Sequence, residues 1–288
     1  MRRAEGAPVA YPRPMLAALV VLAQLQPLPK NLVPLDSDAG RALFAEAESQ
    51  RPYFRLSSQF LTQKTTTYCG VAASVMVLNA LPLEAPVAKE WAPFRAFTQD
   101  NVFDASASLG ITAEHVASGG LTLDQLAALL LANHAEPRAL HAADATVDAF
   151  RTDASQALRS PEAYVLVDFL RSGLGQDTGA HWSPLAAYDA KADRFLVLDV
   201  ARFRYPPYWA TTADLWTAMS TNDPDSGKTR GYVIVRPSAG APGRAPVAPV
   251  GHRIIWMASL VVAAIFAAGA VTGALIMRWR WKPAPRVA

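Results

Sequence analysis

The single cysteine among the 288 residues is the first candidate for chemistry. Cys69 directly precedes an apolar stretch, Ser74 to Leu81, which predicts a buried helix beginning near the cysteine. A thiol at a helix start lies close to unpaired backbone N–H groups and the positive end of the helix dipole, which favour the thiolate. The alternative is a small buried hydrophobe, because a lone cysteine often serves only packing.

A cysteine nucleophile needs a base, a group that orients the base, and a donor for the oxyanion. Gln63, six residues before Cys69, carries a side-chain N–H that can serve as the donor. For the base and its partner the sequence offers His181 and Asp199. His181 and Asp199 can act as base and orienting group only if the fold brings them together.

Two apolar runs, residues 182–188 and 195–200, flank a polar segment, which predicts a β-hairpin. Pairing across the turn places His181 opposite Arg202, and Asp199 three residues before Arg202 on the second strand. Diagonal neighbours on paired strands are within side-chain reach, so the hairpin predicts His181 beside Asp199. Alternatively, His181 is a strand residue whose hydrogen bonds are made within the fold, and Asp199 is a turn residue that ends the second strand.

The elements around these residues change in kind along the chain. The first half predicts helices, at residues 69–81, 122–134 with a capping box formed by Thr122 and Gln125, and 144–158. The second half predicts strands at 164–170 and 231–235 besides the hairpin, and one helix at 212–220. Helices followed by an antiparallel sheet indicate an α+β fold.

The net charge of +3 is unevenly distributed. Residues 1–13 carry +2 and residues 252–288 carry +5, so the stretch between them carries −4. The basic balance therefore belongs to the ends, and nothing in the middle indicates a nucleic-acid surface. One cysteine also excludes an intrachain disulfide and a multi-cysteine zinc site.

Both ends have features of membrane targeting. Residues 254–277 are 24 uncharged, largely apolar residues, enough for a transmembrane helix, and Arg278–Lys282 adds basic and tryptophan anchors. Near the start, basic residues precede an apolar run from Met15 to about Leu25, which is typical of a signal segment, although no clean cleavage site follows. Excess positive charge after the span predicts a cytoplasmic tail and a catalytic domain on the extracytoplasmic, periplasmic side.

Composition also sets the expected domain boundaries, because residues 238–253 are rich in Pro, Gly and Ala and predict a linker. The expected organisation is a signal-like segment (1–29), a catalytic domain (30–237), the linker (238–253), a transmembrane helix (254–277) and a basic tail (278–288).

Four segments resemble phytochelatin synthase in its bacterial short form, a branch of the papain-like cysteine transferases. The matching pieces are Gln63 with Tyr68–Ala72 and Val77–Leu81, Gly119–Thr122, Gly179–Pro184, and Leu198–Trp209. The resemblance covers nearly all of residues 30–237, and its last segment is the longest and most specific. It implies a papain-like fold with the cysteine on a helical half and the histidine and aspartate on a sheet half.

The resemblance also implies roles: Cys69 as nucleophile, His181 as general base and acid, Asp199 as its orienter and Gln63 as oxyanion donor. The implied substrate is glutathione, cleaved at its Cys–Gly bond, with the γ-glutamylcysteinyl group passing to a second glutathione or to water. Cd²⁺ or Zn²⁺ would arrive on glutathione thiolates, with no tightly bound cofactor, and the family implies a homodimer. Metal detoxification or turnover of glutathione and its conjugates would be the purpose.

Glutathione carries two carboxylates, for which Arg202 and Arg230 are the candidate partners. The chain departs from the plant members in having a predicted membrane helix instead of a cysteine-rich C-terminal region, and in its residues 64–67. Two other functions remain open: an exported papain-like cysteine peptidase, and a non-catalytic membrane-tethered module that binds thiols or metals.

Overall fold

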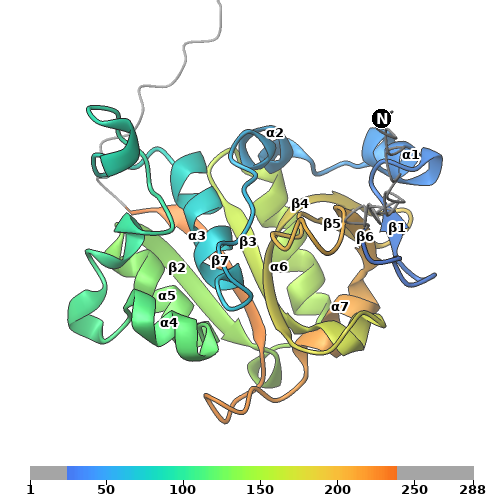
Figure 1. Ribbon diagram of the computed structural model, residues 1–288. Helices are drawn as coiled ribbons and strands as arrows, with labels where there is room; N and C mark the ends of the chain where they lie inside the picture. The colour runs from blue at the N-terminus through green and yellow to red at the C-terminus, as the bar shows by residue number, and fades with distance from the viewer. Residues whose placement is uncertain (1–24, 239–288) are drawn as a thin grey trace, which may run out of the picture.

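Residues 25–238 are described here by a computed structural model. They build one seven-stranded sheet in which every neighbouring pair of strands is antiparallel. The strand order across the sheet is β1-β6-β5-β4-β3-β7-β2, so β4 and β3 lie at its centre (Figure 1). With helices packed on this sheet, the predicted α+β class is confirmed.

The strands are β1 (Val33–Pro34), β2 (Ala135–His141), β3 (Tyr164–Leu170), β4 (Ala180–Asp189), β5 (Arg194–Val197), β6 (Tyr208–Thr211) and β7 (Gly231–Pro237). The α-helices of the described residues are α1 (Asp38–Glu46), α2 (Arg51–Ser58), α3 (Cys69–Ala80), α4 (Ala113–Gly119), α5 (Leu123–Ala132), α6 (Val147–Arg159) and α7 (Thr212–Met219).

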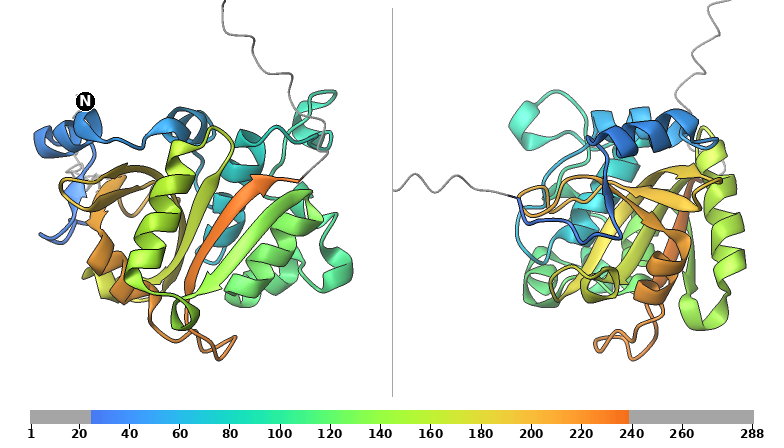
Figure 2. Two further views of the ribbon diagram at one scale, coloured as in Figure 1. Left: turned by 180° about the vertical axis from the view of Figure 1, so that it is seen from behind. Right: turned by 90° about the vertical axis from the view of Figure 1, so that its right-hand side faces the viewer.

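Helices cover both faces of the sheet. α3 and α5 belong to the core on one face, and α6 and α7 to the core on the other (Figure 2). Successive side chains of β3 alternate between the two, with Leu166 in the first core and Val165 and Val167 in the second. A strand covered on both faces must be apolar at nearly every position, which explains why β3 has no polar alternation.

α3 is the central helix of its layer. Every residue of α3 except Asn79 is buried, as expected for a helix that is apolar on all sides. Asn79 accepts a hydrogen bond from the Phe97 amide and donates one to the Phe97 carbonyl, both at 2.9 Å. This helix fixes the position of Cys69, its first residue, against the middle of the sheet.

The predicted helices and strands are largely confirmed. α5 begins after Thr122, whose side chain accepts from the Gln125 amide while Gln125 accepts from the Thr122 amide, so the capping box is present. α6 begins three residues later than predicted because Thr146 is its N-cap. The sequence interpretation missed α1, α2, α4, β1 and β6, which are short, and β2, in which only Ala135 is buried.

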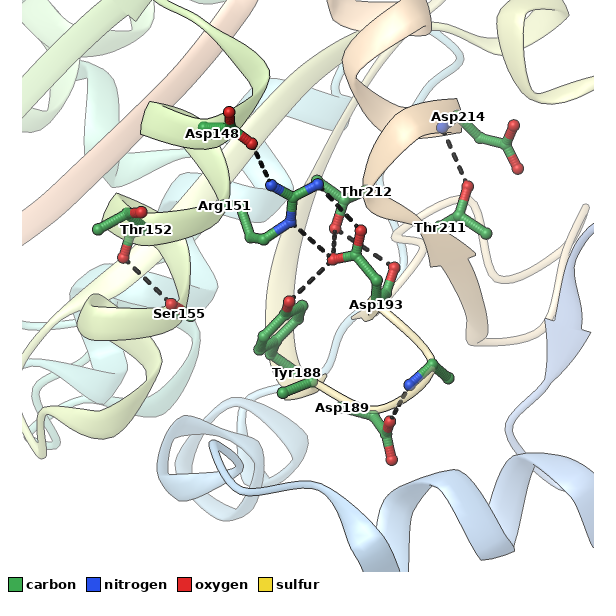
Figure 3. A network of polar contacts seen from close by, with 12 residues as sticks. Asp148, Arg151, Thr152, Ser155, Tyr188, Asp189, Asp193, Thr211, Thr212 and Asp214 are labelled. Atoms are coloured by element: carbon green, nitrogen blue, oxygen red, sulfur yellow. Dashed lines mark hydrogen bonds and ion pairs between the residues drawn. The ribbon is translucent and has the colours of Figure 1, made fainter.

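The β4–β5 hairpin is fixed to the helices by Asp193, a turn residue with a φ of +49°. Its carboxylate accepts from Arg151 of α6 at 2.9 and 3.0 Å, from Tyr188 at 2.8 Å and from Thr212 of α7 at 2.6 Å (Figure 3). One side chain therefore joins the turn to α6 and α7. This network stabilises the turn end of the hairpin, which is the end of β4 away from His181.

The predicted hairpin register is confirmed near the turn, where Asp189 pairs with Arg194 and Tyr188 with Phe195. Its extension to a pair between His181 and Arg202 is wrong. A bulge between Leu185 and Ala187 shifts the register, and β5 already ends at Val197. Asp199 therefore approaches His181 from the segment that leaves the strand, rather than along a ladder.

None of the helices within residues 25–238 has both the length and the hydropathy needed to cross a bilayer. The apolar segment 254–277, the linker before it and most of the signal-like segment lie outside the described residues.

Candidate active site

Cys69 is held at the N-terminus of α3, facing the start of β4. The thiol is buried, and the backbone N–H of Trp182 is directed at its sulfur. The Trp182 indole donates to the Leu121 carbonyl at 2.9 Å, which holds the start of β4 in position. At Gly70 an added Cβ would lie 3.2 Å from the Trp182 ring, so the lack of a side chain permits this close approach.

His181 is the residue before Trp182, at the start of the central strand β4, and its side chain is buried. Its Nε2 lies 2.8 Å from Oδ1 of Asp199 and 3.0 Å from the Ser183 hydroxyl. The Phe169 and His181 rings form a T-shaped pair with centroids 5.5 Å apart. Because these partners occupy Nε2, Nδ1 is the nitrogen that remains to exchange a proton with a neighbouring thiol.

Asp199 is bound by a guanidinium that the sequence interpretation missed. Arg171 donates from Nη1 to Oδ2 at 2.9 Å and from Nη2 to Oδ1 at 3.0 Å. Both residues are almost fully buried, and the Ala201 amide donates to Oδ1 as well. Gln176 accepts from the same guanidinium at 2.7 Å. A signal existed in the sequence, since Arg171 directly follows a buried strand where a charge needs a partner.

The charges around this pair set its protonation. Burial would raise the pKa of Asp199, but His181 and Arg171 outweigh it and hold that pKa below its ordinary value. Burial is also the main reason that the pKa of His181 is lowered, against the opposing effect of Asp199. Asp199 is thus a carboxylate beside a neutral imidazole at neutral pH.

The cysteine differs from what its position in the sequence indicates. Burial raises the pKa of Cys69 to about 11, and the Trp182 and Gly70 amides offset only part of this rise. The helix start therefore does not by itself produce a thiolate. A protonated thiol needs a general base that takes its proton as the sulfur attacks, and a neutral histidine is suited to that role.

Gln63 lies on the segment that connects α2 to α3. Its amide N–H donates to the Val200 carbonyl at 3.0 Å, which ties it to the residue after Asp199. The buried side chain donates through Nε2 to the Thr65 carbonyl at 2.6 Å, and one N–H of that group remains for another acceptor.

A cavity of about 310 Å³ is lined by Asp168 of β3 and by another predicted residue, Arg230. The buried guanidinium lies 3.6 Å from the carboxylates of Asp168 and Asp223, distances too long for hydrogen bonds. Burial raises the pKa of Asp168 well above its ordinary value, although Arg230 opposes this. The walls also include Gly119, Leu121, Thr122, Leu170, Ala180, Asn222, Pro224 and Asp225.

Arg202 is placed differently. It is exposed, stacks on the Phe60 ring at 4.8 Å and donates to the Phe60 carbonyl at 3.3 Å. It does not line the cavity that Arg230 lines. The structure thus brings His181 to Asp199 and Cys69 to the neighbouring Trp182, and it separates the two predicted arginines.

Metal ligands do not gather in the described part of the chain. No group of three or more His, Cys, Asp or Glu side chains converges within residues 25–238.

A cysteine at a helix start, facing a histidine–carboxylate pair on a sheet, is the arrangement of cysteine-dependent acyl-transfer enzymes. Comparison with known proteins agrees with this class: the model of the family described as phytochelatin synthase matches residues 23–232. The chain belongs to the phytochelatin synthase family.

Curated relatives match over nearly the same range. Glutathione gamma-glutamylcysteinyltransferase 3 of Lotus japonicus is 36% identical over 209 residues, 72% of this chain and 42% of the relative. Glutathione gamma-glutamylcysteinyltransferase 1 of Arabidopsis thaliana is 32% identical over 73% of this chain and 43% of its own length. The Schizosaccharomyces pombe protein is 29% identical over 73% of this chain and 50% of its own. The match therefore spans about half or less of each relative's length.

Proposed function

We propose that the chain is a glutathione γ-glutamylcysteinyltransferase and hydrolase with Cys69 as its nucleophile. The observation that carries the proposal is the His181–Asp199 contact, 2.8 Å long, at the strand start that faces Cys69. This is the base and orienter that a buried thiol requires.

In the first half-reaction, the Cys69 sulfur attacks the carbonyl carbon of the Cys–Gly peptide bond as His181 takes the thiol proton. The oxyanion that forms accepts a hydrogen bond from the free Nε2–H of Gln63. The C–N bond then breaks, and His181 gives its proton to the departing amine of glycine. A γ-glutamylcysteinyl thioester remains on Cys69.

In the second half-reaction, His181 removes a proton from the attacking group. Attack by the amino group of a second glutathione forms a new peptide bond and yields phytochelatin, whereas attack by water yields γ-glutamylcysteine. In both cases the C–S bond of the thioester breaks, and His181 returns the proton to the Cys69 sulfur. Asp199 stabilises the imidazolium in both halves, and Arg171 keeps Asp199 ionised and oriented.

The cavity lined by Arg230 suits the amino-acid end of the γ-glutamyl group. That end carries a carboxylate and an ammonium, and the cavity offers one guanidinium and two carboxyl groups, from Arg230, Asp223 and Asp168. Arg230 would bind the carboxylate and the two aspartates the ammonium. Arg202, exposed three residues after Asp199, is the proposed partner for the glycine carboxylate or for the second glutathione.

Metal enters this reaction as part of the substrate. Cd²⁺ or Zn²⁺ bound to glutathione thiolates would be presented by the second glutathione, since Cys69 is the only thiol of the chain. Phytochelatin as the product would serve detoxification of such metals, and γ-glutamylcysteine as the product would serve turnover of glutathione and its conjugates. A homodimer is part of the same proposal.

The proposal includes a membrane location. The 24 uncharged residues 254–277 support a transmembrane helix, and the basic residues after them support a cytoplasmic tail. The papain-like catalytic domain would then lie on the extracytoplasmic side.

The test is to incubate the full chain with glutathione, with and without Cd²⁺ or Zn²⁺, and to measure products by mass spectrometry. We expect free glycine together with γ-glutamylcysteine or phytochelatin, and neither with Cys69→Ser. A wild-type protein that releases no glycine refutes the activity. Cleavage of unrelated peptides instead would identify a peptidase, and metal binding without turnover would identify a binding module.

A further inference from the structure

Most of the large apolar side chains that are exposed lie at one end of the domain. Five of the eight large apolar side chains that are exposed within residues 25–238 lie there: Phe54, Val87, Trp91, Phe94 and Leu131. Phe94 is 73% exposed, and Phe54 is 68% exposed although it lies beside Phe44 and Tyr53; both values are high for aromatic residues. We call these five residues the apolar end.

The elements that carry them converge at this end. Val87, Trp91 and Phe94 lie on a small loop closed by the bridge between Val87 and Arg95, which follows the C-terminal end of α3. Phe54 is on α2, where Arg55 donates to the Ala80 carbonyl at that same end of α3. Leu131 is in the last turn of α5, directly before β2.

The same end holds the last described residues. β7 ends at Pro237, which pairs with Ala135 at the start of β2, and the Ser238 hydroxyl donates to the His134 carbonyl. In Figures 1 and 2 the end of β7 and the loop between α3 and α4 both point to the upper side of the molecule. From Ser238, 15 residues lead to the apolar segment that begins at Ile254. The chain therefore leaves the described domain at this end, and those 15 residues span at most about 50 Å.

The active site occupies the opposite end of the sheet. His181 is at the start of β4, opposite Phe169 near the end of β3, whereas β7 begins at Gly231 beside the cavity and runs away from it. Seven residues of β7 span about 20 Å, which separates the catalytic centre from the apolar end.

We propose that the apolar end docks on a lipid surface, with Trp91 and Phe94 in the interfacial layer and the active site facing away. This inference rests on the proposed membrane span, because the span brings this end to the bilayer. Trp91 and Phe94 are suited to an interface, where aromatic rings enter the headgroup region. The charges beside them balance, because Lys89 is followed by Glu90 and Arg95 forms an ion pair with Glu84, so the rings carry the attraction. Glutathione would then enter from the aqueous side.

The lone cysteine permits a direct test. In a Cys69→Ser background, Phe94→Cys or Phe203→Cys supplies the only thiol of the full chain. Phe203 is the matched control, because it is 55% exposed on the segment after Asp199 and outside the apolar end. Each variant is labelled with an environment-sensitive fluorophore and reconstituted into vesicles of phosphatidylcholine and phosphatidylglycerol, with or without nitroxide-labelled headgroups.

We expect the label at Phe94→Cys to shift its emission to the blue and to be quenched by the nitroxide lipids, and the label at Phe203→Cys to do neither. Flotation with the vesicles is measured in parallel. A chain that does not float refutes the membrane span and the docking together. A chain that floats with an aqueous, unquenched label at Phe94→Cys refutes the docking alone. A blue shift that grows with protein concentration and resists nitroxide quenching assigns this face to a second copy of the chain. Glutathione turnover is irrelevant to every outcome, so the proposed activity is tested separately.

Discussion

Replacing Arg171 by methionine removes the guanidinium that holds Asp199 in the interior. The ion pair has two hydrogen bonds of 2.9 and 3.0 Å, and Asp199 has no exposed surface. Opposite charges about 4 Å apart in an effective dielectric of about 20 interact by about 4 kcal/mol. Removing one partner of a buried pair costs about 3–5 kcal/mol, since the other charge stays buried. We expect the free energy of unfolding of Arg171→Met to fall by that amount.

The same change should alter the protonation of His181. Arg171 lowers the pKa of His181 and, together with His181, that of Asp199. Without Arg171 the carboxylate acts on the imidazole alone, so the pKa of His181 rises and the acid limb of the glycine-release profile moves to higher pH. A lowered pKa in the folded state means that Asp199 stabilises the wild-type fold above its unfolded pKa of about 4, and that this contribution is lost as the pH falls. In Arg171→Met the pKa of Asp199 in the folded state is less depressed, so this contribution at neutral pH is smaller.

The assay is urea unfolding of the full chain in detergent micelles, followed by tryptophan fluorescence, with the pH dependence of glycine release measured in parallel. Arg202→Met is the matched control, because an exposed arginine stacked on Phe60 should change the free energy of unfolding by less than about 1 kcal/mol. If Arg171→Met behaves like this control and its pH profile is unchanged, the reasoning that Arg171 positions Asp199 is refuted.

Four further changes test other parts of the structure. Alkylation of Cys69 by iodoacetamide should reach half its maximal rate only well above pH 9, since burial raises the pKa of the thiol to about 11; a midpoint below pH 7 would indicate a preformed thiolate. Arg230→Lys should raise the KM for glutathione about tenfold or more with a smaller effect on kcat, because it weakens binding of the substrate carboxylate; an unchanged KM would remove Arg230 from the cavity's function. Asp193→Ala should lower the free energy of unfolding by about 2 kcal/mol while Asp193→Asn, which tolerates the positive φ, loses less; equal losses would contradict the hydrogen-bonded role of the side chain. Thr122→Ala should cost about 1 kcal/mol by removing the cap of α5, measured by thermal unfolding, and no change would contradict the capping box.

Local patterns in the sequence predicted the elements that carry the site. The all-apolar run before Pro82 predicted α3, the capping residues predicted α5, and the polar turn predicted the β4–β5 hairpin. These signals succeed because the packing of each element agrees with its local preference. The hairpin predicted that His181 and Asp199 lie close together, and they do. The predicted reason was wrong, because the pairing of β4 with β5 stops at Val197, before it reaches Asp199. A turn does not determine the register of strands beyond a bulge.

Contacts between residues far apart in the sequence could not be predicted from local patterns. Arg171 and Asp199 are 28 residues apart, and nothing in their spacing shows that they form a bidentate pair. Asp168 was treated as one residue of an apolar strand, yet it lines the cavity with Arg230. Cys69 illustrates the same limit, since its helix position indicated a lowered pKa and only the packing around it reveals that burial dominates.

The central claim is that Cys69 forms a thioester with the γ-glutamylcysteinyl group of glutathione. The most direct measurement is the intact mass of the full chain after brief incubation with glutathione and acid quenching. We expect a mass increase of one γ-glutamylcysteinyl group on the wild-type chain, removed by hydroxylamine and absent from Cys69→Ala. An unmodified wild-type chain that nevertheless releases glycine, or an equal adduct on Cys69→Ala, would contradict it.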